Sequence, residues 1–456
     1  MYDVIIVGAR VAGASTAMLL ARKGMSVLVL DRASFPSDTL STHQVQLPGI
    51  ARLQRWGLLD RLASAGTPAT RTVRFDTGQA VLRGTFPRHE GVDVLYSPRR
   101  TLLDAMLVQA AREAGAEVRT DVVADELCWE DGTVSGVRGR TKSGSALSER
   151  ARVVVGADGK HSLVARAAGA PEYRVTPPLT AACYTYWAGL PVTGGEVYTR
   201  ERRAIGVWPT NDGLVMTYVA LPIREFETAR RDLQSCMLAA FDLAGGLGER
   251  VRAGQRAERV RATTDLPNAF RRPHGPGWAL VGDAGLVMDP ISGQGIADAF
   301  RDAELLSEAL ELTLSGRARM QAAMSRYERA RNRAARPMFD FTTQLARLAP
   351  PTPAEQRLFA AIAEQPAQVE RFFGVLTGAV AQREFFAPGS LVRLVGARGI
   401  ARLVLDKARA NRANKAGQVL AAPTSDAEGS PGDQGRASPW KTASTLLPSR
   451  SRTNTP

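Results

Sequence analysis

Three segments that combine glycine with an acidic residue stand in a fixed order along the chain, and they constrain the fold more than any other feature. The first is Gly8–Gly13, followed at a distance by Asp31. The second is Gly156–Gly159, and the third joins Gly282–Ala284 to Asp289–Gly295. Each pattern alone is a weak signal, but each lies here at the end of an apolar strand or the start of a helix. Their order favours one dinucleotide-binding unit assembled from three distant parts of the chain.

The first segment lies inside a strand–helix–strand pattern of about 30 residues, the size of a β–α–β unit. The pattern predicts a strand over Val4–Val7, a helix over Ala14–Lys23 and a strand over Ser26–Leu30. The turn departs from the usual nucleotide-binding pattern in one place, because Arg10 stands where the middle glycine is expected. Its side chain either covers a bound cofactor or faces solvent.

This turn has the chemistry of a pyrophosphate site. The N-terminus of a helix presents free N–H groups and the positive end of its dipole to an anion. Gly8 permits the tight turn, and Gly13 lets the helix lie close to the strand. Asp31 ends the second strand, where a carboxylate can accept hydrogen bonds from both ribose hydroxyls of an adenosine, and Arg32 beside it belongs to the same predicted site. The alternative is a β–α–β unit that binds no nucleotide.

The second part of the third segment, Asp289–Gly295, has the chemistry of a flavin site. Pro290 fixes a rigid turn, and Gly293 and Gly295 lead into a predicted helix over Ile296–Leu310. N–H groups near Gly295 and Ile296 can bind the N1–C2 carbonyl edge of an isoalloxazine, and the helix dipole would stabilise the negative charge of a reduced flavin. The alternative is a glycine-rich corner between a strand and a helix.

Three charged side chains are candidates for the polar parts of such a cofactor. Gly282-Asp283 follows an apolar strand, so the carboxylate can accept hydrogen bonds from ribityl hydroxyls. Asp158, in the second segment, would lie in the same cleft, with an ordinary Asp-Gly turn as the alternative. Arg100 begins a predicted helix and can clamp a diphosphate with two parallel hydrogen bonds, with an exposed surface charge as the alternative.

The rest of the chain supplies a second, different architecture. Arg71–Phe86 and Leu179–Ile223 alternate apolar and polar residues, which predicts an antiparallel sheet. Gly295–Ala413 has helical patterning that breaks near Leu348–Pro351. The fold class is therefore α/β, a Rossmann-like domain with an inserted antiparallel β-sheet substrate domain and a helical C-terminal region. We expect the first domain over 1–70, 98–170 and 267–330, the second over 71–97 and 171–266, the helical region over 331–420, and a disordered tail over 421–456.

Composition favours a soluble globular protein. Of the 456 residues, 44% are hydrophobic and 23% are charged, and no apolar run is as long as a membrane span. Met1–Asp3 leads directly into the first strand, so we expect a cytoplasmic protein without a signal peptide. Cys128, Cys183 and Cys236 are isolated from one another, which predicts neither a disulfide framework nor a metal site.

The net charge of +14 comes almost wholly from arginine and is dispersed along the chain. The densest basic stretch is Leu391–Gly417, where apolar residues interleave with the charges. This pattern predicts a helix packed on its apolar side with a solvated basic face, and the alternative is a weak peripheral contact with an anionic membrane surface. No nucleic-acid motif accompanies the charge, so we expect no nucleic-acid partner.

Together the three segments resemble the class A flavoprotein monooxygenases, the p-hydroxybenzoate hydroxylase-like superfamily, which also includes geranylgeranyl-reductase-like enzymes and flavin-dependent halogenases. The resemblance covers residues 1–330 and implies a glutathione-reductase-type Rossmann-like fold. It also implies that Asp158 serves both FAD and the pyrophosphate of NAD(P)H, and that backbone near Val122–Ala124, assigned here to Ala124, contacts adenine. The positions that the resemblance assigns to FAD are Gly8, Gly13, Asp31, Arg100, Asp283, Gly295 and Ile296.

The resemblance implies an NAD(P)H-consuming monooxygenase. In such enzymes NAD(P)H reduces FAD, oxygen adds at the flavin C4a position to give a hydroperoxide, and an electron-rich substrate takes the distal oxygen. The expected substrate is an aromatic or polycyclic small molecule that is hydroxylated or epoxidised, in bacterial secondary metabolism or aromatic catabolism. The cofactor carries this chemistry, so no side chain is required as a covalent nucleophile.

His43 is the candidate for a catalytic polar group, because it lies in the loop after the second strand, which in this superfamily runs toward the flavin ring. The alternative is a structural histidine. Tyr184, Tyr186, Trp187 and Trp208 lie on the predicted substrate sheet, where aromatic side chains form either a core or a wall that binds a ring.

Other functions of the superfamily fit less well. The halogenases need an active-site lysine after the dinucleotide unit and a Trp-x-Trp-x-Ile motif, and the chain has no lysine between Lys23 and Lys142 and no such motif. An isoprenoid double-bond reductase is the main alternative, although the loop after Asp31 lacks the cysteine-glycine element of those enzymes. A non-enzymatic flavin- or lipid-binding protein is a third and weaker hypothesis.

Overall fold

The structure is a computed structural model that describes residues 1–396 and 399. Its first sheet has the order β19-β20-β10-β1-β2-β7, in which the five strands from β20 to β7 are parallel and β19 is antiparallel at the edge. Apolar runs such as Val27–Leu30 are buried throughout, as expected of a parallel sheet that is covered on both faces. The strands are β1 (Tyr2–Val7), β2 (Val27–Leu30), β7 (Glu117–Arg119), β10 (Ala146–Gly156), β19 (His274–Gly275) and β20 (Trp278–Leu280).

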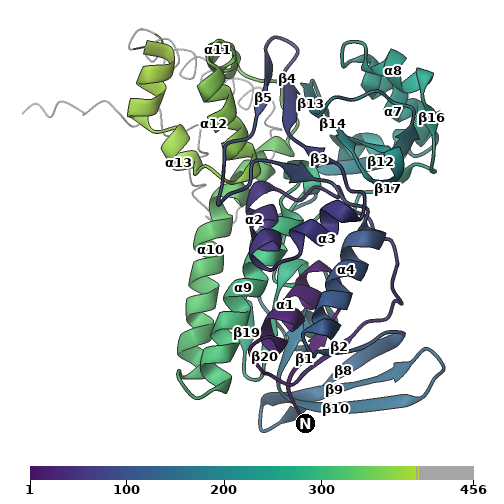
Figure 1. The fold of residues 1–456 in the computed structure, drawn as a ribbon, viewed down its shortest axis with the longest axis vertical. Coiled ribbons are helices and arrows are strands. Elements are labelled where there is room, and N and C mark those ends of the chain that lie inside the picture. The colour runs from purple at the N-terminus through teal and green to yellow at the C-terminus, as the bar shows by residue number, and fades with distance from the viewer. Residues whose placement is uncertain (397–398, 400–456) are drawn as a thin grey trace, which may run out of the picture.

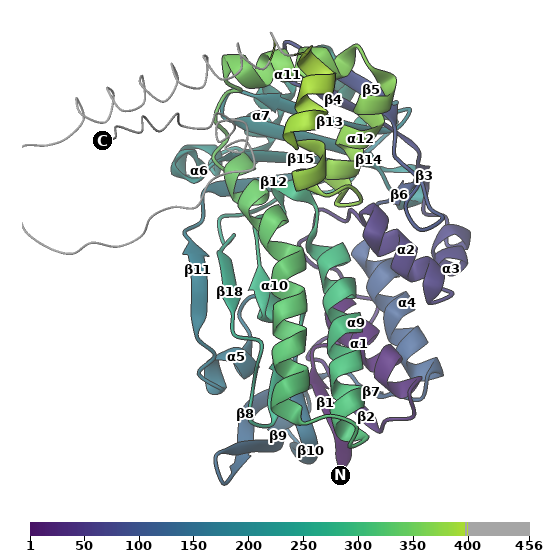
Figure 2. The same cartoon turned by 90° about the vertical axis from the view of Figure 1, so that its left-hand side faces the viewer.

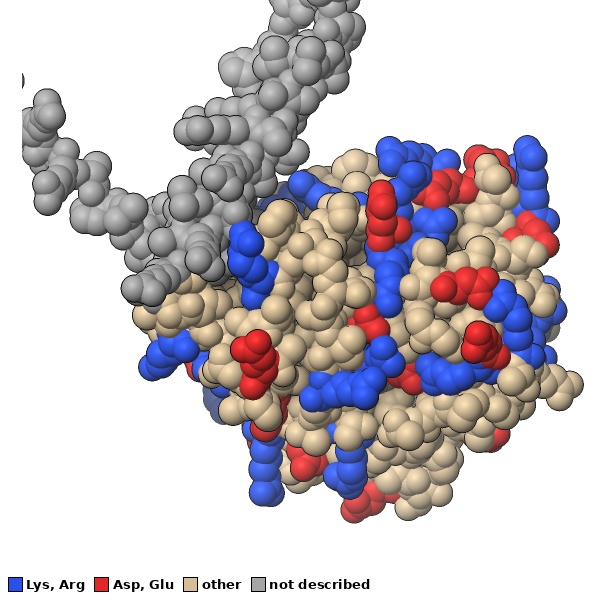
Figure 3. All heavy atoms as spheres, turned by 90° about the horizontal axis from the view of Figure 1, so that it is seen from above, with Lys and Arg blue, Asp and Glu red and all other residues tan. Residues whose placement is uncertain are grey.

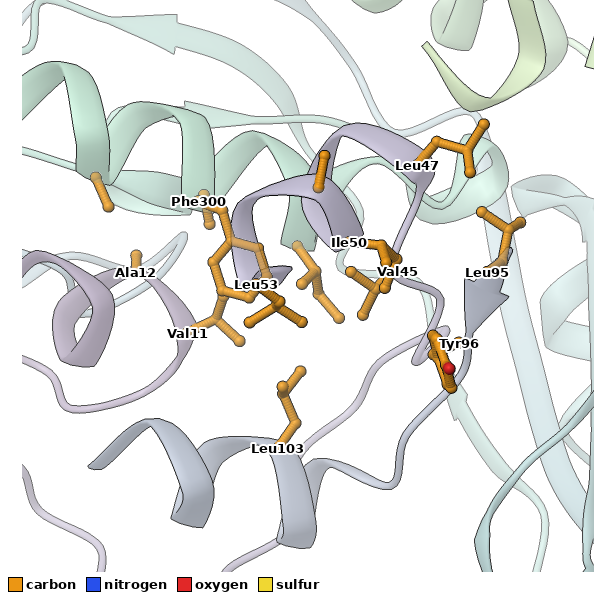
Figure 4. Close-up of a cluster of buried hydrophobic side chains, with 14 of the residues drawn as sticks. Val11, Ala12, Val45, Leu47, Ile50, Leu53, Leu95, Tyr96, Leu103 and Phe300 are labelled. Carbon is orange, nitrogen blue, oxygen red and sulfur yellow. The ribbon is translucent and has the colours of Figure 1, made fainter. Parts of the chain in front are cut away.

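Helices from three parts of the chain pack on this sheet and on one another (Figure 1). Val11, Leu53, Leu103 and Phe300 come from four different helices and point into one apolar cluster (Figure 4). Burial of these side chains holds the helices against each other, and Glu304 of α9 also accepts hydrogen bonds from Arg52 and Arg55 of α2. The helices are α1 (Val11–Ala21), α2 (Leu47–Arg55), α3 (Leu59–Ser64), α4 (Arg100–Glu113) and α9 (Gly295–Leu314).

Two smaller sheets and one short helix complete this half of the molecule. β8 (Val122–Glu130) and β9 (Thr133–Thr141) form an antiparallel meander with the first part of β10, and α5 (Leu163–Ala167) follows β10. A three-stranded sheet joins β11 (Glu172–Thr176), β18 (Asn268–Arg271) and β21 (Leu286–Val287). The meander lies at the end of the molecule that also carries the N-terminus (Figure 1).

A second sheet contains both of the predicted alternating stretches, in the order β16-β12-β15-β14-β13-β4-β5 with β17 beside β12. The prediction of a wholly antiparallel sheet is wrong at one pair, because β4 and β13 run parallel, with Val73 opposite Gly195. This pair joins the two insertions into one sheet. The strands are β4 (Thr72–Asp76), β5 (Val81–Thr85), β12 (Thr180–Ala188), β13 (Gly195–Arg200), β14 (Arg203–Pro209), β15 (Val215–Pro222), β16 (Gln255–Arg256) and β17 (Arg261–Thr263), while β3 (Ala69–Thr70) pairs only with β6 (Leu95–Tyr96).

The substrate region is not all sheet, which corrects the prediction for residues 171–266. Three helices follow β15 and pack on one face of the sheet, where Met237, Phe241 and Val251 meet Cys183 and Val219. The other face turns toward the first sheet. The helices are α6 (Phe226–Ala229), α7 (Leu233–Asp242) and α8 (Leu247–Ala253).

The C-terminal helices form a third unit against β5. α10 (Met320–Leu345) runs alongside α9 and passes through the predicted boundary at residue 330, so that boundary lies inside one helix (Figure 2). The predicted break near Leu348–Pro351 is confirmed, because Thr352 caps the next helix through a capping box. The remaining helices are α11 (Pro353–Ala363), α12 (Pro366–Thr377) and α13 (Gln382–Phe385), and Phe75 packs against Phe359 and Phe372.

The predicted tail, 421–456, and most of the basic stretch Leu391–Gly417 lie outside the described residues. Within the part of the chain that the structure describes, no helix has both the length and the apolar character needed to cross a membrane. The same part contains no group of three His, Cys, Asp or Glu side chains arranged to hold a metal ion. On the face drawn in Figure 3, basic and acidic side chains are intermingled rather than gathered into a single basic patch.

Candidate functional site

The three sequence segments meet in one cavity of about 780 Å³. Most of the predicted cofactor residues line it, although they come from the two ends and the middle of the first 300 residues. Gly13, Gly282 and His43 are the predicted site residues that do not line it. The lining residues that the sequence predicted are Gly8, Asp31, Arg32, Arg100, Ala124, Asp158, Asp283, Pro290, Gly293, Gly295 and Ile296.

The first turn is built so that only glycine fits at two positions. Gly8 has a φ of +103°, and a Cβ there would lie 2.5 Å from the carbonyl oxygen of Ala157 in the second segment. A Cβ at Gly13 would lie 1.8 Å from the carbonyl oxygen of Gly8. Gly13 therefore acts behind the cavity wall, by letting α1 approach the end of β1, and the first and second segments are in direct contact.

The Asp31 carboxylate is fixed at the end of β2. Its Oδ2 accepts a hydrogen bond from the backbone N–H of Ala9 at 2.6 Å, and its Oδ1 accepts one from Ala33 at 2.8 Å. Two backbone donors fix the orientation of the group beside the first turn. Carboxylate oxygens retain further lone pairs, so the group can also accept hydrogen bonds from a ligand hydroxyl.

Arg10 lines the cavity, and its guanidinium group is held by protein groups at the cavity edge. It donates to Asp104 at 2.6 Å and to Ser37 and the carbonyl oxygen of Asp38 at 3.0 and 3.1 Å. Arg100 donates to the same Asp104 carboxylate at 2.9 Å. One buried acid thus holds two arginines at the edge of the cavity, where their charge suits a diphosphate.

The third segment presents an acid and an open helix end to the cavity. The Asp283 side chain lies deep in the molecule but is exposed to the cavity, and desolvation raises its pKa while Arg100 opposes the shift. A Cβ placed on Gly295, the first residue of α9, would meet no atom within 4 Å. The backbone at this helix N-terminus is therefore accessible from the cavity, as a site for the carbonyl edge of a ring requires.

Asp158 has one satisfied and one unsatisfied oxygen. Oδ2 accepts hydrogen bonds from the backbone N–H groups of Leu163 and Val164 at 2.6 and 3.3 Å. Oδ1 is buried and has no hydrogen-bond partner among the described residues, and burial raises the pKa of the group.

His43 does not reach the cavity. It is fully buried, its Nδ1 lies 2.8 Å from the carbonyl oxygen of Ser41, and its Nε2 contacts the hydroxyl of Tyr186. Burial lowers its pKa to about 3, with Arg100 adding to the shift. A neutral ring next to a carbonyl oxygen must donate from Nδ1, so Nε2 accepts from Tyr186. Both ring nitrogens are used by protein groups, and the predicted catalytic role has no support from this geometry.

The substrate sheet supplies the far wall of the cavity. Of the aromatic residues that the sequence singled out, Tyr184 lines it, whereas Tyr186, Trp187 and Trp208 do not. Tyr218 lines it as well and was not predicted, although it occupies an alternating position in the same apolar–polar stretch as Tyr184. The other lining residues on this side include Ala182, Ala262, Leu266, Pro267, Val287 and Met288.

Sequence reasoning also missed the supports behind the third segment. The Tyr327 hydroxyl of α10 donates to the carbonyl oxygen of Leu280 at 2.8 Å. Arg331, which is fully buried, donates to the carbonyl oxygens of Gly285 and Arg271 at 3.0 Å each. These contacts fix the strand and turn on either side of Asp283. No local pattern reveals them, because an arginine in the middle of a polar helix is ordinarily exposed.

Comparison with known proteins identifies the family. The family described as "FAD binding domain" matches residues 1–342. Digeranylgeranylglycerophospholipid reductase 2 of Methanothermobacter thermautotrophicus is 31% identical over 347 residues, which are 72% of this chain and 82% of that protein. Protein FixC of Salmonella typhi is 32% identical over 180 residues, covering 37% of this chain and 39% of FixC.

Solved structures confirm the fold. The flavin-dependent brominase Bmp2 superposes with a TM-score of 0.71 at 18% identity, over 83% of this chain and 93% of the brominase. A geranylgeranyl bacteriochlorophyll reductase-like protein of Thermoplasma acidophilum gives 0.67 at 21% identity, over 82% and 96%. The predicted Rossmann-like fold, the oxidoreductase class and the FAD cofactor are thereby confirmed. This chain belongs to the FAD binding domain family of FAD-dependent oxidoreductases.

Proposed function

We propose that this protein is an NAD(P)H-consuming monooxygenase that hydroxylates or epoxidises an aromatic or polycyclic small molecule. The observation that carries the proposal is the continuity of the cavity. It runs from the three glycine-and-acid segments to the inner face of the second sheet, where Ala182, Tyr184 and Tyr218 line it. A cofactor bound by the three segments and a ring against the sheet would share one cavity.

Different residues of the three segments would contact different parts of the cofactor. Asp31, with Arg32 beside it, would hold the adenosine ribose, and backbone at Ala124 would meet the adenine. The N–H groups of the Gly8–Gly13 turn and the charge of Arg100 would hold the diphosphate.

The third segment would hold the flavin end. Asp283 would accept from the ribityl hydroxyls, and the N–H groups at Gly295 and Ile296 would meet the carbonyl edge of the ring, with Pro290 and Gly293 shaping the turn before them. Asp158 lines the same cavity and would serve both FAD and the pyrophosphate of NAD(P)H.

When bound, FAD supplies the transfer of electrons from NAD(P)H to dioxygen. The protein would position the cofactor and the substrate and limit the access of water to them. The aliphatic lining from Leu266, Val287 and Met288 would limit the access of water to the substrate end of the cavity. No lining side chain is required as a nucleophile.

A second candidate is an FAD-dependent reductase of isoprenoid double bonds. One observation favours it, the 31% identity with a digeranylgeranylglycerophospholipid reductase over 82% of that protein. The geometry gives it less support, because none of Cys128, Cys183 and Cys236 lines the cavity that the described residues form. A reductase needs a proton donor beside the flavin. None of these three cysteines lies where it could act as that donor.

One experiment separates the two candidates. The FAD-loaded protein is incubated with NADPH under ¹⁸O₂, with a panel of phenols and quinones in one set and a geranylgeranylated glycerophospholipid in the other. A ligand-stimulated consumption of NADPH with ¹⁸O in the product supports the monooxygenase. Saturation of the isoprenoid chain under anaerobic conditions, with no ¹⁸O in any product, would replace it by the reductase.

A further inference from the structure

The side chain of Gln294 connects the third sequence segment to the C-terminal helices. Gln294 lies between Gly293 and Gly295, which both line the cavity, and it is the residue before α9. Gln294 itself does not line the cavity, and it is buried, with 4% of its surface exposed. Its Nε2 group donates to the carbonyl oxygen of Leu376, in the last turn of α12, at 2.9 Å.

This hydrogen bond satisfies a carbonyl group at the end of α12. The last four carbonyl groups of a helix lack a partner within the helix itself. In α12, the carbonyl oxygen of Gly374 accepts from the backbone N–H of Val380 at 2.9 Å. For the carbonyl oxygen of Leu376, the donor is the side chain of Gln294. A residue inside the family match, 1–342, therefore caps a helix that lies outside that match.

The same helix is fixed to the substrate sheet. Phe372 of α12 packs on Phe75 of β4, with ring centroids 5.7 Å apart. A Cβ placed on Gly84 of β5 would lie 3.2 Å from the Val369 side chain of α12. α12 thus contacts the second sheet through its middle and the turn before α9 through its C-terminal end. The position of that turn relative to the substrate sheet therefore depends on α12.

Two further hydrogen bonds hold the turn. Thr342 of α10 donates to the hydroxyl of Ser292 at 2.7 Å, and Gln46 donates to the carbonyl oxygen of Ser292 at 3.2 Å. None of these three residues lines the cavity. The shape of the turn is therefore set by contacts behind the cavity wall, while the backbone at Gly293 and Gly295 faces the cavity.

We propose that Gln294 is a positioning residue for the flavin end of the cofactor, through which α12 sets the place of the N–H groups at the start of α9. The assignment rests on the proposed placement of FAD in the cavity and not on the reaction that FAD carries out. Loss of the hydrogen bond would leave the carbonyl group of Leu376 without this donor and would release the turn. The adenosine end, at the Gly8–Gly13 turn and Asp31, does not depend on this contact.

The test compares two ligands of the apoprotein by calorimetric titration. In the proposed placement FAD contacts the whole site, whereas ADP has no flavin and contacts only the part built by the Gly8–Gly13 turn and Asp31. We expect Gln294→Leu to weaken FAD binding by about twofold to tenfold, the range for one net hydrogen bond, and to leave ADP binding unchanged. Gln294→Asn, whose amide group is too short to reach α12, should have the same selective effect.

The matched control is Gln365→Leu. Gln365 lies at the opposite end of α12, and its Nε2 group donates to the carbonyl oxygen of Leu394 at 3.2 Å. The control therefore removes a similar hydrogen bond from the same helix without touching the turn before α9. Its ratio of FAD affinity to ADP affinity should equal that of the wild type. A general loss of stability would affect Gln365→Leu and Gln294→Leu alike, so the ratio reports on position.

Three results would overturn the proposal: an unchanged ratio in both Gln294 variants, an equal loss of FAD and ADP affinity, or the same change of ratio in Gln365→Leu. Asp283→Ala separates this proposal from the placement of FAD. If Asp283→Ala lowers the ratio and the Gln294 variants do not, only the role of Gln294 is wrong. If none of them changes the ratio, or if ADP does not bind the wild type, the placement of FAD is contradicted as well.

Discussion

Arg10 and Asp104 form an ion pair of 2.6 Å in which the Asp104 side chain is completely buried. Arg10 belongs to the turn after β1 and Asp104 to the second turn of α4, so the pair ties the first glycine segment to a helix about 90 residues away. Arg100 donates to both oxygens of the same carboxylate, at 2.9 and 3.0 Å. The acid therefore orders two cations at the place where a diphosphate would bind.

Replacing this acid should damage both stability and cofactor binding. Asp104→Asn leaves two guanidinium groups close together without their buried counter-charge, and breaking a buried pair from one side costs about 3–5 kcal/mol. We expect the free energy of unfolding, measured by urea denaturation, to fall by about that amount. The control is Glu113→Gln, in the exposed pair with Arg61, which should leave the midpoint unchanged. Equal effects of the two variants would show that burial of the pair is unimportant.

His43 should make the stability of the protein depend on pH. Its folded-state pKa of about 3 lies below its unfolded value of about 6.5, so the unfolded chain binds the extra proton between these values. Stability is fully present above pH 6.5 and falls as the pH drops toward 3, by about 1.4 kcal/mol per pH unit from this group. His43→Gln keeps an acceptor for Tyr186 and should flatten the profile by that slope. The exposed His161, replaced by glutamine, is the comparison; an unaltered slope in His43→Gln would contradict the burial argument.

Local sequence patterns predicted the strands and turns that line the cavity, because each of these elements depends on residues that are neighbours in the sequence. Apolar runs gave β1 and β2, and the glycines at 8 and 13 gave the turn between β1 and α1. The pairing of β4 with β13 could not be predicted, because it joins strands about 120 residues apart through backbone hydrogen bonds that any sequence can make. The helices α6–α8 were missed because the strong alternation that ends at Ile223 was extended to the whole insertion.

The direction in which a side chain points was the second feature that could not be predicted from the sequence. The sequence places Arg10 in the turn, but it did not predict that the guanidinium group would pair with Asp104. His43 lies in the expected loop, yet its side chain packs behind the cavity against Tyr186. Tyr184 lines the cavity whereas Tyr186, two residues along the same strand, does not, and the sequence pattern is the same for both.

Arg331 should stabilise the turn that carries Asp283. Arg331→Met removes donors to the carbonyl oxygens of Gly285 and Arg271, of which Gly285 keeps the backbone N–H of Arg271 as a partner, and we expect a cost of roughly 1–3 kcal/mol of unfolding free energy. FAD should also dissociate faster, in a stopped-flow measurement with excess apoprotein as a trap. Arg333→Met, at an exposed position of the same helix, is the control. If both variants release FAD at the wild-type rate, the buried arginine has no part in holding the site.

Asp283 should be required for the retention of FAD. The group is exposed to the cavity, and a hydrogen bond to an ionised acceptor contributes about 1.5–3 kcal/mol, so Asp283→Ala should weaken FAD binding by at least about tenfold. The ratio of absorbance at 450 nm to that at 280 nm in the purified protein measures occupancy. Asp283→Asn keeps one acceptor and should give an intermediate value. A full complement of FAD in Asp283→Ala would remove this residue from the proposed site.

Gly295 and Gly13 should respond to alanine in opposite ways. A methyl group at Gly295 meets no atom within 4 Å and lies in the first turn of α9, so Gly295→Ala should leave the unfolding temperature of the apoprotein unchanged or slightly raised. The same methyl group projects into the cavity, and crowding a bound ring by one carbon costs about 1–3 kcal/mol, which predicts FAD binding weaker by about tenfold.

Gly13→Ala, by contrast, would place a methyl group 1.8 Å from the carbonyl oxygen of Gly8. It should lower the unfolding temperature before any ligand is added. The measurement is thermal unfolding of the apoprotein together with FAD titration by fluorescence quenching. Gly295→Ala that unfolds early, or that binds FAD as tightly as the wild type, would show that α9 does not present its N-terminus to the cofactor.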